Sequence, residues 1–205
     1  MSWLSDNELD SAIRGNNFIL QQQRLNGFYC GCHPTSLASY LDNDLFHRKG
    51  LSCYDHVLCL IPHYKGVFAA DQLPPHQSEP MCFIMNSDPA SKPGRHWMAY
   101  YQDGHVCEFF DSFGQSASSY PHIHQWLENS DYERLSCRLQ GPSAYCGAYC
   151  YFYLTQRPKA RSMHNLFFTK GPYIFQCDRD LDMNDSFIFQ YLYYDIENVL
   201  NKAAR

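Results

Sequence analysis

The chain has 205 residues, of which 45% are apolar and 16% aromatic; these proportions exclude a disordered chain and suit a single domain with one core. The net charge is −5 and the 16 basic residues are scattered, so the composition gives no support for nucleic-acid binding. No apolar run has the length of a membrane span, and the N-terminus lacks the basic-then-apolar pattern of a signal peptide. We therefore expect an intracellular protein, in the nucleus or cytoplasm, with no membrane partner.

The first quarter of the chain is the least informative. Ser5 stands three positions before Glu8 as a capping pair, and Gly15 follows as a stop signal, which predicts a short amphipathic helix. Residues 16–63 show no clear pattern. We treat 1–205 as one domain in which 16–63 is an insertion packed against the domain or a cover over its cleft.

The cysteine content indicates thiols. Ten cysteines are well short of the density of a secreted disulfide scaffold, and in a reducing compartment most would be thiols. Zinc is an alternative for two clusters with short spacing, Cys30 with Cys32 and His33, and Cys53 with His56 and Cys59. Neither has the paired two-residue spacing of a zinc knuckle, so we predict no metal site and no cofactor.

Residues 95–114 predict a β-hairpin that follows a buried strand over 81–86 and a loop over 87–94. Two aromatic-rich runs flank Asp103 and Gly104, a strong signal for a two-residue turn. With the turn there, His96 lies directly opposite Asp111, with Cβ atoms roughly 4.5–5.5 Å apart. The carboxylate could then orient the imidazole for proton transfer. The alternative is a surface pair without a role.

The next segments bring a thiol to the start of a helix. A helix over 120–127 and a strand over 134–139 lead to Gln140, and a Gly-Pro-Ser turn then runs into an apolar segment that reads as a buried helix from Cys146. A helix start stabilises a thiolate, which makes Cys146 the candidate nucleophile. The Gln140 amide and the Cys146 N–H could form an oxyanion hole. The alternative is that Cys146 is a small buried apolar residue.

The C-terminal part is expected to contribute packing. Residues 156–161 form a polar break with the densest positive charge, which we read as a loop, although it could steer an acidic peptide. Residues 187–200 have helical spacing, with Asp185 as a plausible cap. The predicted architecture is α+β, a twisted and mostly antiparallel sheet packed against a helix whose start presents Cys146.

Taken together, these segments resemble the adenovirus-type (adenain-like) cysteine endopeptidases of the Ulp1-type protease superfamily, with the order His, acid, Gln, Cys. Within that group the likeness is closest to the protease of Maverick/Polinton elements. The matching residues are 66–74, 96–97, 110–114, 140, 146–150 and 184–185, and the likeness covers about residues 64 to 195. The adenovirus enzyme departs in two respects: it has Glu at the position of Asp111, and one more residue between Gln and Cys. The six-residue spacing found here is that of the Ulp1 branch.

The resemblance implies a cysteine endopeptidase that matures capsid precursors of a virus or transposon, cleaving after small residues such as Gly. Its catalytic residues would be His96, Asp111, Gln140 and Cys146. Asp71, Trp97 and Gly147 are candidates for the substrate cleft, although core packing is the default role of Trp97.

Several alternatives stay open at this point. The adenovirus enzyme uses DNA and a viral peptide as cofactors; the acidic charge gives no support for DNA, whereas an activating peptide remains possible. The same four residues would also suit an enzyme that removes ubiquitin-like modifiers from proteins. A non-catalytic binding domain derived from the same fold is the third alternative.

Overall fold

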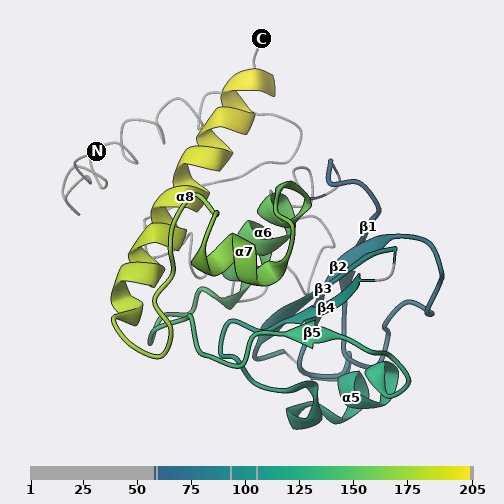
Figure 1. The fold of residues 1–205 in the computed structure, drawn as a ribbon. Coiled ribbons are helices and arrows are strands. Elements are labelled where there is room, and N and C mark those ends of the chain that lie inside the picture. Colours follow the sequence, from purple (N-terminus) through teal and green to yellow (C-terminus); the bar gives the residue numbers. More distant parts are fainter. Residues whose placement is uncertain (1–57, 59, 93, 105, 204–205) are drawn as a thin grey trace.

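The computed structural model describes residues 58, 60–92, 94–104 and 106–203 and contains one five-stranded sheet with helices around it (Figure 1). The strands are β1 (Tyr64–Phe68), β2 (Met81–Asn86), β3 (Trp97–Asp103), β4 (Val106–Phe110) and β5 (Glu133–Arg134). The helices are η1 (Ala117–Ser119), α5 (Pro121–Leu127), α6 (Cys146–Gln156), η2 (Arg157–Lys159), α7 (Met163–Phe168) and α8 (Leu181–Ala203). The helix predicted near the N-terminus, most of residues 16–63 and both zinc candidates lie outside the described residues. No described helix combines the length and apolar character needed to cross a membrane.

The sheet order is β1-β2-β3-β4-β5, which confirms the α+β architecture. The pairs at the centre, β2 with β3 and β3 with β4, are antiparallel. The two edge strands, β1 and β5, each run parallel to their neighbours. The sheet is therefore antiparallel at its centre, as predicted, and parallel at its two edges; the sequence pattern missed β1 because its residues do not alternate clearly.

The hairpin exists, but its turn lies one residue later than predicted. Asp103 pairs with Val106 and Tyr100 with Phe109, so the ladder includes Asp103 and the connection follows it. Gly104 takes a φ of +59° at the start of that connection, a conformation that glycine adopts without steric cost. The shift moves each residue's partner by two positions, and an even shift leaves every side chain on its predicted face.

The two faces of the sheet pack against different cores, and this is why β2 and β3 are apolar at nearly every position. Alternate residues, such as Ile84 and Ala99, join a large core with α6, α7 and α8. Their neighbours, such as Phe83 and Tyr100, face a smaller core with α5. Figure 1 shows α5 on the side of the sheet opposite α6. Burial on both faces holds the ends of β3 and β4 in place.

The predicted strand over 134–139 is wrong beyond its first residue. Only Glu133 and Arg134 pair with β4; afterwards the backbone N–H groups of Leu139 and Gln140 donate to the Ser112 carbonyl. After Arg134 the chain leaves the sheet, because these hydrogen bonds tie it to the turn that follows β4. A Cβ on Gly114 would lie 2.3 Å from the Cys137 carbonyl oxygen, so this close approach requires glycine.

Three further expectations for the second half need correction. Helix α8 starts at Leu181, so Asp185 lies inside the helix rather than capping it. Arg157 does not belong to a solvated loop: it is buried in η2 and paired with Glu108. Cys137 and Cys177 form a disulfide, whereas Cys82, Cys107, Cys146 and Cys150 are thiols as expected. The partner that each residue contacts is at least 36 residues away in sequence: Tyr149 for Asp185, Glu108 for Arg157 and Cys177 for Cys137.

Candidate active site

His96 and Asp111 form a buried pair at adjacent ends of the central strands. His96 immediately precedes β3 and Asp111 immediately follows β4. The imidazole Nε2 lies 2.8 Å from Asp111 Oδ1. The predicted contact is therefore present in the structure, although the two residues are diagonal rather than directly opposed in the ladder.

The Asp111 carboxylate is fully engaged by three donors. Besides His96 Nε2, the Phe113 backbone N–H donates to Oδ1 at 2.8 Å, and the Tyr120 hydroxyl donates to Oδ2 at 2.7 Å. Both oxygens are thus held in place in a buried site, where hydrogen bonds to a charged group are strong. The orientation of the carboxylate is fixed before any substrate arrives.

The state of the imidazole follows from its partner. An ionised carboxylate only accepts hydrogen bonds, so Nε2 carries the proton, and in the neutral ring Nδ1 is then an acceptor. His96 Nδ1 is buried and has no hydrogen-bond partner within the described part of the chain. The ring stacks on Phe113, with ring centroids 4.7 Å apart, and on Tyr120, with ring centroids 6.2 Å apart. This arrangement suits a base that removes a proton through Nδ1.

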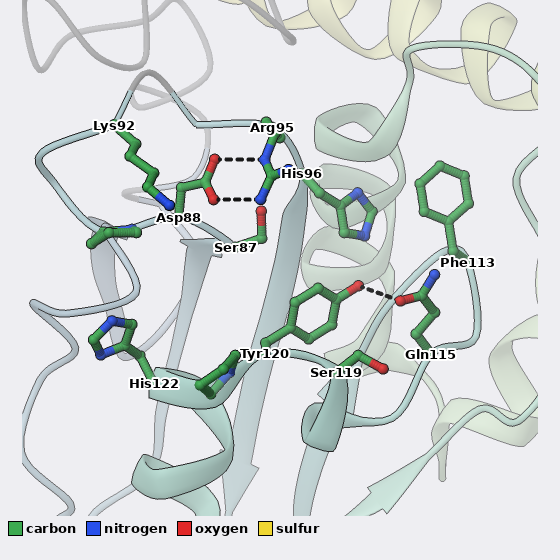
Figure 2. A pocket seen from close by; sticks show the side chains of 12 residues that line it. Ser87, Asp88, Lys92, Arg95, His96, Phe113, Gln115, Ser119, Tyr120 and His122 are labelled. Carbon is green, nitrogen blue, oxygen red and sulfur yellow. Dashed lines mark hydrogen bonds and ion pairs between the residues drawn. The ribbon is translucent and has the colours of Figure 1, made fainter.

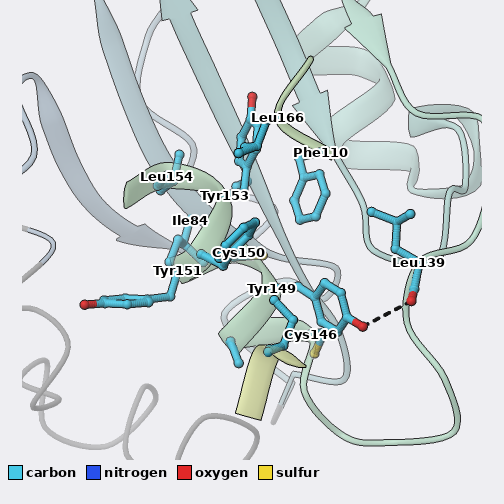
Figure 3. Close-up of a cluster of buried hydrophobic side chains, with 14 of the residues drawn as sticks. Ile84, Phe110, Leu139, Cys146, Tyr149, Cys150, Tyr151, Tyr153, Leu154 and Leu166 are labelled. Atoms are coloured by element: carbon cyan, nitrogen blue, oxygen red, sulfur yellow. Dashed lines mark hydrogen bonds between the residues drawn. The ribbon is translucent and has the colours of Figure 1, made fainter. Parts of the chain in front are cut away.

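The thiol of Cys146 stands at the first residue of α6, as predicted (Figure 3). Burial raises the pKa of the Tyr120 hydroxyl, and the charges of Asp111 and Cys146 raise it further. Burial likewise raises the pKa of Cys150, with added contributions from Cys146 and Asp111. Cys146 and Asp111 thus both influence Tyr120 and Cys150, which indicates that the start of α6 lies in the same region as the end of β4.

Gln140 lies just before the turn over 141–145, which separates it from Cys146. Its Oε1 accepts from the Ser112 hydroxyl at 2.7 Å, so its Nε2 faces the turn over 141–145 and donates to the Ser143 carbonyl at 2.6 Å. An amide nitrogen has two N–H groups, and within the described part of the chain an acceptor is found for one of them. The Ser112 hydroxyl thereby sets which end of the Gln140 amide faces the turn.

The turn itself is anchored by distant residues. The Arg138 guanidinium donates to the carbonyls of Gln140 and Gly141 at 2.6 and 2.9 Å. From α8, Asp185 Oδ1 accepts from the Gly141 N–H at 3.0 Å and from the Tyr149 hydroxyl at 2.8 Å. A Cβ on Gly141 would come within 2.5 Å of the Asp185 carboxylate. A side chain at this position would therefore displace the Asp185 carboxylate from its contacts with the turn.

The three cleft candidates occupy different environments. Asp71 is exposed, and its Oδ1 accepts from the Ala90 N–H at 2.8 Å, so it braces the loop after β2. Trp97 is buried in the large core, in keeping with its default packing role. Gly147 is buried in the first turn of α6, next to Cys146.

The pattern reasoning missed four residues that hold the site: Ser112, Phe113, Tyr120 and Arg138. The sequence pattern predicts Tyr120 only as the start of a helix and Arg138 only as part of a strand. Their roles depend on contacts with Gln140, His96 and Asp111, and no local sequence signal encodes such contacts.

One group of side chains in the described residues has its potential ligand atoms close enough to share a metal ion: Cys137, Cys177 and Asp178, within 4.8 Å of one another. The two sulfurs are joined in the disulfide. A disulfide sulfur is not a thiolate, and thiolates are the metal-binding form of cysteine. The disulfide therefore accounts for the short distance between the two sulfurs, and this group is not a metal-site candidate.

Solved structures that are similar to this chain include the following two. The crystal structure of the ASFV pS273R protease has a TM-score of 0.38 and 14% identity, covering 83% of this chain and 87% of that chain. A structure of AvrA delL154 with IP6 and CoA has a TM-score of 0.37 and 11% identity, covering 80% of this chain and 69% of that chain. No family model matches the chain, and no match is found among curated proteins. At these scores the chemistry has to be derived from the side chains described above.

Proposed function

We propose that this protein is a cysteine endopeptidase of the adenain and Ulp1 type, with Cys146 as nucleophile, His96 as base and acid, Asp111 as orienting carboxylate and Gln140 as oxyanion donor. The observation that carries the proposal is the 2.8 Å bond from His96 Nε2 to Asp111, which leaves a buried Nδ1 without a partner among the described residues. Helix α6, which begins with the Cys146 thiol, packs against β3, the strand that follows His96. A base, its orienting group and a nucleophile are the parts that acyl transfer requires.

The reaction proceeds in two steps. His96 Nδ1 takes the proton of the Cys146 thiol, and the thiolate attacks the carbonyl carbon of a peptide bond. The Gln140 Nε2–H and the Cys146 backbone N–H stabilise the resulting oxyanion. Collapse breaks the C–N bond, and the imidazolium gives its proton to the leaving amine. Water, deprotonated by His96, then hydrolyses the thioester and restores the thiol.

The proposed substrates are proteins, in particular capsid precursors of a virus or a Maverick-like element cut after small residues such as Gly. This part rests on the resemblance of the motifs around the four residues. The cytoplasm or nucleus is the proposed compartment, and an activating peptide is a proposed partner. The six-residue spacing from Gln140 to Cys146 favours removal of ubiquitin-like modifiers as the second candidate.

Cleavage profiling of a peptide library with the purified protein tests the proposal. The Cys146→Ala variant should lose cleavage, and a thiol-directed activity probe should label the unmodified protein at Cys146. Cys150→Ala is the matched control, because Cys150 lies one turn further along α6 and faces the core. Equal cleavage by the unmodified protein and Cys146→Ala would refute the proposal. A panel of modifier-derived substrates, compared with capsid-type peptides, separates the two candidate substrates.

A further inference from the structure

A pocket of about 480 Å³ opens directly beside His96 (Figure 2). This volume is within the usual size of small-ligand sites, roughly 300–1,000 Å³. Phe113 and Tyr120, the two rings that flank the imidazole, form part of its wall. Lys92 and Arg95 come from the loop after β2, and His122 comes from α5.

The position of the pocket assigns it to one side of the scissile bond. Its lining includes His96 but neither Gln140 nor Cys146. In acyl transfer the imidazole protonates the leaving nitrogen, whereas the oxyanion donors hold the acyl carbonyl. The pocket therefore lies where the part of the substrate after the cleaved bond would leave.

The charges in the pocket do not cancel. Both oxygens of Asp88 are bound by the Arg95 guanidinium, at 3.0 Å each, with Asp88 buried and the Arg95 side chain 78% exposed. Among the described residues no ion pair engages Lys92. Asp88 is the one carboxylate in the lining, so the Lys92 charge is left to attract an anion. In Figure 2 Lys92 and His122 lie on one side of the view, with Phe113 and Gln115 on the other.

The loop that carries these charges is braced. The Asp88 N–H donates to Asn86 Oδ1 at 2.8 Å, and its carbonyl accepts from Ala70 N–H at 3.0 Å. Asp71 holds the Ala90 N–H, and the Ser87 N–H donates to the His96 carbonyl at 2.9 Å. The pocket is thus preformed, which lowers the ordering cost of binding.

We propose that this pocket binds a carboxylate in the leaving segment of the substrate, through Lys92, so that the enzyme favours peptides with an acidic group shortly after the cleaved bond. The proposal rests on the proposed peptidase function. The carboxylate could be an Asp or Glu side chain or the free C-terminus of a short leaving segment, since both present the same group.

The test uses matched peptides with Glu, Gln or Lys at each of the first three positions after the cleaved bond. The unmodified protein should show a kcat/KM about five-fold higher for Glu than for Gln at one of these positions at low salt, as expected for a partly exposed ion pair, and added salt should reduce the difference. Lys92→Glu should reverse the preference in favour of Lys. Lys170→Glu, a charge change on an exposed lysine of another segment, should leave it unchanged.

A second set of peptides separates the two sources of the carboxylate. Two-residue leaving segments with a free or an amidated C-terminus are compared in the same assay, and a preference for the free acid assigns the pocket to a terminal carboxylate. A preference for Glu within long, amidated peptides assigns it to a side chain.

Binding to the Cys146→Ala protein, measured by fluorescence anisotropy, keeps this test independent of catalysis. A Glu preference that disappears in Cys146→Ala/Lys92→Glu supports the pocket even if the peptidase proposal fails. Equal binding and equal cleavage of the Glu, Gln and Lys peptides, and of free and amidated ends, would overturn the carboxylate site while leaving the peptidase proposal in place.

Discussion

The buried ion pair between Glu108 and Arg157 offers the sharpest test of how the two halves of the site are joined. Glu108 is 0% exposed and Arg157 is 5% exposed. Arg157 Nε and a terminal nitrogen donate to the two Glu108 oxygens at 2.6 and 2.8 Å. The Tyr153 hydroxyl and the Met163 N–H complete the carboxylate's partners. The pair links β4, which leads to Asp111, with the end of α6, which starts at Cys146.

Arg157→Met should destabilise the protein strongly. Methionine keeps the apolar stem of the side chain, so the main loss is the guanidinium. Burial by itself would lower the pKa of Arg157, whereas the hydrogen bonds and charge of Glu108 raise it, so Glu108 is the main group that stabilises the buried cation. Removing one partner of a buried pair leaves an uncompensated charge and costs about 3–5 kcal/mol. At roughly 2–4 °C per kcal/mol for a domain of this size, Tm should fall by about 6–20 °C.

Urea denaturation with a double-mutant cycle measures the effect. Glu108→Gln should be destabilised for the same reason, and the double variant should be more stable than the sum of the two single changes predicts, because no unpaired charge remains. Arg161→Met, on an exposed arginine four residues later, is the control and should change stability by less than about 0.5 kcal/mol. Single variants within about 1 kcal/mol of the unmodified protein, a range typical of exposed pairs, would refute the described burial.

Three further predictions concern the residues around the site. Tyr120→Phe removes one of three donors to Asp111 and should lower kcat by about ten-fold with little change in KM, since a hydrogen bond to a charged group is worth about 1.5 kcal/mol or more; steady-state kinetics would contradict this if KM alone changed. Asp185→Ala leaves the Gly141 N–H and Tyr149 hydroxyl without their acceptor and should cost about 1–3 kcal/mol in thermal unfolding, whereas Asp185→Asn, which keeps an acceptor, should cost less. Burial raises the pKa of Cys82 to about 12 and that of Cys150 well above its usual value, so at pH 8 about one Cys82 in 10⁴ is a thiolate; mass spectrometry after brief alkylation should find both unlabelled, and labelling of Cys82 at the rate of an exposed thiol would show that it is not buried.

Local patterns determined the elements of this protein that depend on neighbouring residues. The strand over 81–86 and the helix over 120–127 follow from short apolar runs and their flanking turn signals. The hairpin follows from aromatic runs around Asp103 and Gly104, and its turn was misplaced by one residue because several pairings of such runs satisfy the same signal. The contact of His96 with Asp111 survived the error, since the period of a strand is two and the partner shift was even.

Tertiary structure decided how the pieces are held together. Gln140 is oriented by Ser112, the turn before Cys146 by Arg138 and Asp185, and Asp111 by Tyr120. The partners of Arg157 and Cys137, at Glu108 and Cys177, were equally outside the reach of local patterns. Hydrogen bonds and ion pairs between distant segments depend on where the packed core brings the chain, and such positions leave no periodicity or spacing in the sequence. The candidate reacting groups could therefore be proposed from local chemistry, whereas the groups that orient them required the folded chain.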